Sequence, residues 1–118
     1  NLYGKDLYAQ VQNTFQEYPN VAIIRGSVPG TLKQCKAESV CYLSIDMNCA
    51  YPELEALAFF YEKLSPSAWV ILDDYGFSQF VHQRKALDAF AKDVGVDILE
   101  LPTGQGIIVK APSVFESR

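Results

Sequence analysis

Apolar and polar positions along the chain form two kinds of pattern, and each predicts its own kind of element. Apolar residues recur at helical spacing over residues 7–18, 51–64 and 78–94, which predicts three amphipathic helices. Short, mainly apolar runs at residues 21–24, 40–45 and 68–72 predict buried strands, and we expect the last, which is continuous, to be covered on both faces. A short helix is expected at residues 29–36.

The C-terminal third predicts an antiparallel hairpin. Residues 96–101 alternate between apolar and polar, residues 102–106 have the composition of a turn, and residues 107–110 form a returning apolar run. Strands that alternate with helices imply right-handed βαβ units. The sequence therefore predicts one α/β domain over residues 1–118, with a Rossmann-like, mostly parallel sheet that ends in this hairpin.

Composition narrows the classes of partner. The chain has 118 residues, of which 49% are apolar, enough for a single core. The formal charge of -4 and the lack of a Lys/Arg stripe argue against nucleic acids and anionic membranes as partners. No run is long enough to span a bilayer and no secretory pattern opens the chain, so we expect a cytoplasmic protein. The three cysteines match neither a disulfide framework nor a zinc site.

Three aspartates stand directly after two of the predicted strands. Asp46 follows the run at residues 40–45, and Asp73 and Asp74 follow the run at 68–72. If these strands are parallel neighbours, the carboxylates converge at the carboxyl edge of the sheet, where open α/β sheets bind ligands. Oxygen ligands suit Mg²⁺, Ca²⁺ or Mn²⁺. The alternative is that each aspartate caps the helix that follows it.

Three further polar residues have two interpretations each. Asn48 is a cation ligand or hydrogen-bond partner of a substrate hydroxyl, or it forms an Asx-turn. His82 is an acid or base over the cleft, or part of a solvated helix face. Gln105 points into the cleft, or it belongs only to the hairpin turn. No glycine-rich phosphate-binding motif is present.

Several strings resemble the macrocin O-methyltransferase-like family of class I S-adenosylmethionine (SAM)-dependent methyltransferases. The strings are Tyr42-Leu43-Ser44-Ile45-Asp46-Met47-Asn48, Leu54-Glu55-Ala56-Leu57, Tyr61-Glu62-Lys63-Leu64-Ser65-Pro66, Val70-Ile71-Leu72-Asp73-Asp74-Tyr75-Gly76 and Lys85-Ala86-Leu87-Asp88-Ala89-Phe90. The stretch from Arg25-Gly26 to Thr31-Leu32 continues the match, so the resemblance covers roughly residues 20–110.

The resemblance implies methylation of a sugar-like hydroxyl on a small molecule, with Mg²⁺ or another divalent cation held by Asp46, Asp73 and Asp74. It further implies that Gly26, Ser27 and Asp46 contact SAM and that Asp46 and Asn48 are the catalytic positions. Asn48 stands where the family usually has an acid that serves as a general base. Tyr51 stands where another acid commonly follows. These two departures leave the base unassigned.

The resemblance also implies that the first two strands of the fold, which hold SAM, would precede Asn1. We therefore expect the C-terminal portion of a methyltransferase, inactive and without SAM affinity by itself, which forms a homodimer or swapped oligomer through an exposed strand edge. Two alternatives stay open. One is a non-catalytic interaction or dimerisation module derived from a methyltransferase, and the other is an unrelated metal-dependent phosphotransfer domain.

Overall fold

The computed structural model describes residues 7–111, which fall into two compact units that divide between Cys35 and Lys36. The first unit contains helix α1 (Leu7–Phe15) and a 3-10 helix, η1 (Leu32–Gln34). The expected strand at residues 21–24 is wrong, because this segment pairs with no strand among the described residues. The helix expected at residues 29–36 is reduced to η1, since Cys35 is already extended.

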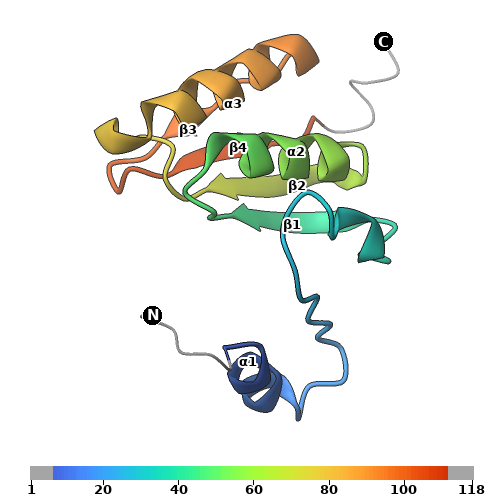
Figure 1. Cartoon of the computed structure of the whole chain (residues 1–118). Helices are drawn as coiled ribbons and strands as arrows, with labels where there is room; N and C mark the ends of the chain where they lie inside the picture. The colour runs from blue at the N-terminus through green and yellow to red at the C-terminus, as the bar shows by residue number, and fades with distance from the viewer. Residues whose placement is uncertain (1–6, 112–118) are drawn as a thin grey trace. The chain divides into compact units, whose positions relative to one another are not determined.

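The second unit is a mixed α/β layer (Figure 1). Its elements are β1 (Val40–Ile45), α2 (Ala50–Tyr61), β2 (Leu64–Leu72), the 3-10 helix η2 (Ser78–Phe80), α3 (Val81–Val94), β3 (Leu99–Glu100) and β4 (Gly106–Val109). The strand order is β1-β2-β4-β3. The β1–β2 pair is parallel, and the pairs β2–β4 and β3–β4 are antiparallel. The predicted α/β class and C-terminal antiparallel hairpin are confirmed.

Helix boundaries differ from those predicted where strand pairing takes residues that the local pattern assigns to a helix. Helix α2 ends at Tyr61, because Leu64 already pairs with Val40 across the parallel ladder. Helix α3 ends as expected at Gly95, whose φ of 77° is the left-handed conformation that glycine adopts without a steric cost. No helix within residues 7–111 is long and apolar enough to cross a bilayer.

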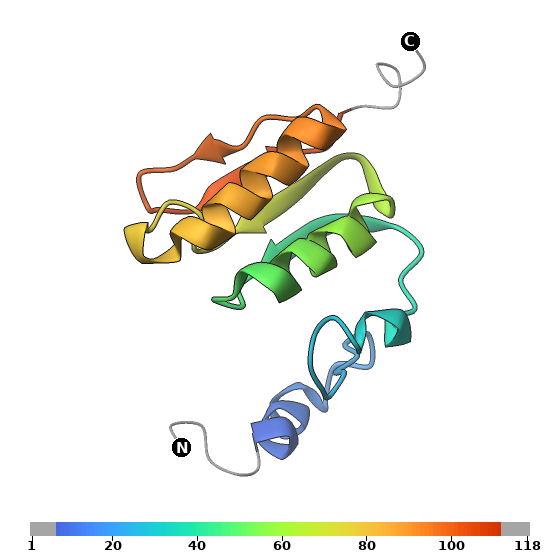
Figure 2. The same ribbon diagram turned by 45° about the horizontal axis from the view of Figure 1, so that its top comes forward.

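Both helices of the second unit lie side by side on the same face of the sheet (Figures 1 and 2). They cover a core whose fully buried side chains are Leu57, Val70, Leu72, Leu87 and Ile108.

Within the second unit, no helix covers the opposite face of the sheet. Tyr42, Trp69 and Val109 are register partners on β1, β2 and β4, and they are 60%, 50% and 48% exposed. Within the second unit, residues 68–72 are therefore covered on one face, and not on both faces as expected.

Candidate functional site: an acidic cluster at the carboxyl edge of the sheet

The three aspartates singled out by the sequence meet at one edge of the sheet. Ile45 and Leu72, the last residues of β1 and β2, are register partners, and the backbone N–H of Asp73 donates to the carbonyl of Ile45 at 3.0 Å. The residues that follow the two strands are therefore adjacent. One carboxylate oxygen from each of Asp46, Asp73 and Asp74 lies within 4.8 Å of the others.

No ion pair among the described residues balances the charge of this cluster. Asp46 is exposed and Asp73 half-buried, whereas Asp74 is only 9% exposed and its Oδ2 has no hydrogen-bond partner in the described structure. Burial raises the pKa of Asp74, and the charges of Asp46, Asp73 and Glu53 raise it further. Among residues 7–111 the one ion pair joins Arg84 to Glu100.

A hard divalent cation fits these observations. Three converging carboxylates are the donor set that Mg²⁺, Ca²⁺ and Mn²⁺ prefer, and a buried carboxylate oxygen without a partner is costly unless a ligand satisfies it.

Capping of helices does not explain the aspartates. The N-cap residues of α2, η2 and α3 are Cys49, Phe77 and Phe80, and none of them makes a side-chain capping bond. The alternative that each aspartate caps the following helix is therefore wrong in the described structure.

Glu53 fixes the loop that follows Asp46, a role the sequence pattern did not predict. Its Oε2 accepts the backbone N–H groups of Met47 and Asn48, each at 3.0 Å, and the side chain is buried. Asn48 has a φ of 54°, which asparagine tolerates better than most residues. Its side chain is exposed, and its catalytic role stays a prediction.

Gln105 connects the hairpin loop to the cluster. Its Nε2 donates to Oδ1 of Asp73 at 3.0 Å, and the hydroxyl of Thr103 donates to its Oε1 at 3.2 Å. The backbone N–H of Gly76 donates to the carbonyl of Gly104 at 2.6 Å. The loop after β2 and the loop before β4 therefore support each other.

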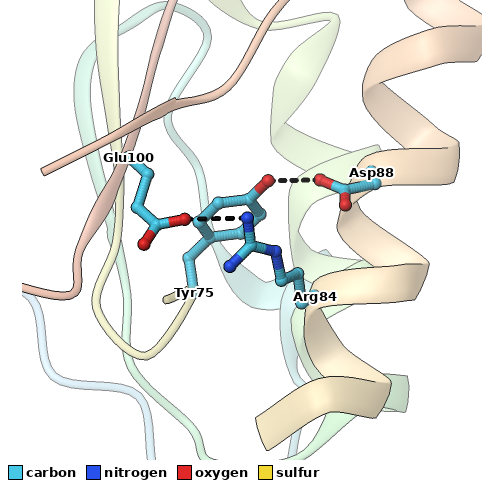
Figure 3. A network of polar contacts seen from close by, with 4 residues as sticks. All are labelled: Tyr75, Arg84, Asp88 and Glu100. Carbon is cyan, nitrogen blue, oxygen red and sulfur yellow. Dashed lines mark hydrogen bonds and ion pairs between the residues drawn. The ribbon is translucent and has the colours of Figure 1, made fainter. Parts of the chain in front are cut away.

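A polar network surrounds Tyr75, the residue that follows Asp74 (Figure 3). The hydroxyl of Tyr75 donates to Oδ1 of Asp88, while the guanidinium of Arg84 lies 4.7 Å from the centre of the Tyr75 ring. Arg84 also pairs with Glu100 at 2.7 Å. Burial, together with the hydrogen bond to Asp88, raises the pKa of Tyr75 to about 12. This network ties the residue after Asp74 to α3 and to β3.

Gly26 and Ser27, which the resemblance assigns to SAM, lie in the first unit and build a turn of their own. The carbonyl of Ser27 accepts both the backbone N–H and the hydroxyl of Thr31, each at 3.0 Å. A Cβ on Gly26 would lie 2.6 Å from Cγ2 of Thr31. A side chain at position 26 would therefore collide with Thr31. The contact of Gly26 and Ser27 with SAM stays a prediction.

His82, the other titratable candidate, is exposed on α3.

Comparison with known proteins gives the family. A family model described as macrocin-O-methyltransferase (TylF) matches residues 7–100. The fold is similar to that of the O-methyltransferase NovP, with a TM-score of 0.64 and 18% sequence identity, over 87% of this chain and 44% of NovP. The chain thus spans less than half the length of that structure. No curated protein matches the sequence. Because the family model matches well over half of its residues, the chain belongs to the macrocin-O-methyltransferase (TylF) family.

Proposed function

We propose that the protein contributes the cation site of a SAM-dependent O-methyltransferase that acts on a sugar-like hydroxyl of a small molecule. The observation that carries this proposal is the uncompensated carboxylate cluster of Asp46, Asp73 and Asp74 at the carboxyl ends of two parallel strands. Membership in the methyltransferase family supplies the reaction class.

In this function the carboxylates of Asp46, Asp73 and Asp74 would hold a divalent cation, which would acidify and orient the acceptor hydroxyl. SAM supplies the methyl group when it is bound. Asp46 is the exposed carboxylate of the cluster, so we assign to it the contact with the acceptor. The amide of Asn48 cannot take up the hydroxyl proton at neutral pH. The hydroxyl proton therefore requires an acceptor other than Asn48.

We further propose that these residues by themselves bind SAM negligibly. Gly26 and Ser27 are occupied by their own turn, and the chain matches only 44% of the NovP chain. Calorimetric titration of this chain with SAM should therefore give no saturable heat. Micromolar binding would overturn this part of the proposal.

The experiment that tests the function uses the full-length protein, labelled SAM and a panel of sugars and glycosides. Methyl transfer should require Mg²⁺ or Mn²⁺ and disappear with a chelator. Loss of a residue that only supports a metal ligand typically lowers activity roughly 10- to 100-fold. Asp73→Asn removes a proposed ligand itself, so it should lower the rate by more than that. Asp93→Asn, an exposed aspartate at the far end of α3, is the matched control and should leave the rate unchanged. Transfer that persists in the chelator excludes the cation role.

A second candidate function is a dimerisation module without catalysis, and the edge of the sheet favours it. Strand β1 pairs only with β2 in the described sheet, and its sequence Val-Cys-Tyr-Leu-Ser-Ile carries none of the charges or prolines that usually protect a free edge. A second copy that pairs through β1 about a two-fold axis would satisfy this edge. A full-length protein that dimerises and shows no methyl transfer would support this candidate over the enzyme.

A further inference from the structure

We propose that Gln105 is a positioning residue for Asp73, which it holds in the orientation that a divalent cation requires. This inference rests on the proposed function, because it assigns a role within the same cation site. Gln105 and Asp73 are 32 residues apart in sequence, and the bond between their side chains measures 3.0 Å.

The hairpin register brings the two residues together. Leu72, which precedes Asp73, is the register partner of Gly106, which follows Gln105. Gly106 itself leaves room for the Tyr75 ring, because a Cβ at this position would lie 2.8 Å from Cγ of Tyr75. The Gln105 backbone therefore lies directly across the ladder from the end of β2, and its side chain reaches Asp73.

The negative charge of Asp73 sets which end of the Gln105 amide faces it. The Thr103 hydroxyl donates to Oε1, and Nε2 is the end directed at the carboxylate. A reversed amide would place Oε1 against the negatively charged Oδ1 of Asp73 and lose a hydrogen bond. The carboxylate therefore favours a donor facing it, whereas the Thr103 hydroxyl, which can donate or accept, fits either orientation of the amide.

The side-chain amide of Gln105 carries no charge, which distinguishes its contact with Asp73 from a salt bridge. A lysine or arginine at this position would hold Asp73 equally well, but its charge would repel an incoming cation and satisfy the carboxylate in its place. The amide orients the carboxylate and leaves its charge available. Residues that orient a ligand in this way typically contribute 10- to 100-fold to metal affinity.

The test is a calorimetric titration with Mg²⁺ of the wild type and three variants of this chain. Gln105→Leu should weaken Mg²⁺ binding about 10- to 100-fold. Gln105→Lys, which keeps a donor but adds a charge, should bind Mg²⁺ no more tightly than Gln105→Leu. Gln79→Leu, an exposed glutamine of η2, is the matched control and should bind as the wild type does.

A spectroscopic readout separates positioning from a merely structural role. The side-chain amide resonances of Gln105, assigned by their loss in Gln105→Leu, should shift as Mg²⁺ saturates the site. The inference is wrong if the wild type binds Mg²⁺ saturably, Gln105→Leu binds it equally tightly and the amide resonances do not move. That result would leave the proposed cation site unaffected. Absence of saturable binding in the wild type contradicts the cation site itself.

Discussion

The hydroxyl of Tyr75 donates a hydrogen bond to Oδ1 of Asp88 on α3, thirteen residues further along the chain, at 2.5 Å. Tyr75 directly follows Asp74 and is buried. The bond therefore anchors the loop that carries two of the three clustered carboxylates to the helix packed over the sheet.

Tyr75→Phe should destabilise the fold by about 1.5–3 kcal/mol, the usual range for a hydrogen bond to a charged group. The folded-state pKa of Tyr75 is raised from 10.0 to about 12, so its contribution is complete below pH 10 and is lost as the pH rises through 12. The difference in unfolding free energy between wild type and Tyr75→Phe should therefore shrink over this range. Urea unfolding at several pH values measures it, and a difference independent of pH would contradict the assignment.

Glu53→Ala should destabilise the fold by about 2–4 kcal/mol, because two backbone N–H groups that Glu53 satisfies would lose their acceptor. Glu55→Ala is the matched control, since Glu55 lies on the same helix and makes no side-chain hydrogen bond in the described structure. Urea unfolding of both variants measures the difference. Equal losses would show that the loop contacts of Glu53 contribute nothing.

The position of the acidic cluster was predictable from sequence, because Asp46 and the pair Asp73-Asp74 each follow an apolar run and parallel neighbours end at the same edge. The partners of the aspartates were not. Gln105 could be interpreted only as a turn residue or a cleft residue, since its contact with Asp73 depends on the β2–β4 register, which no local pattern encodes. Glu53 has the position of an acid in a first helical turn, and its burial arises from tertiary packing.

The strand expected at residues 21–24 was predicted from sequence but does not form in the described structure. Its four apolar residues satisfy the local pattern, but a strand also needs a partner for its ladder, and the described chain provides none. Apolar composition alone therefore overpredicted the parallel part of the sheet.

Asp74→Asn should stabilise the cation-free protein by about 1 kcal/mol, because it removes a buried charge that three neighbouring carboxylates repel. Mg²⁺ at 100 times its dissociation constant should stabilise the wild type by about 2.7 kcal/mol and the variant far less. Thermal unfolding with Mg²⁺ and with a chelator measures both effects. A variant that gains as much from Mg²⁺ as the wild type would remove Asp74 from the site.

The protein should associate through the open edge of β1 at micromolar concentrations. Tyr42→Lys adds a charge to this edge and should shift the chain towards monomer, without loss of stability because Tyr42 is 60% exposed. Tyr51→Lys on α2, where the side chain is 63% exposed, is the matched control and should leave association unchanged. Light scattering over a range of concentrations is the measurement, and a wild type that is monomeric throughout contradicts the prediction.

The cation site is tested most directly by crystals of the protein soaked with Mn²⁺. Anomalous scattering should show one ion bound by carboxylate oxygens of Asp46, Asp73 and Asp74, with Gln105 still hydrogen-bonded to Asp73. No ion should bind there in a variant with both Asp73→Asn and Asp74→Asn. An empty cluster at saturating Mn²⁺, or an ion that remains in the double variant, would contradict the account.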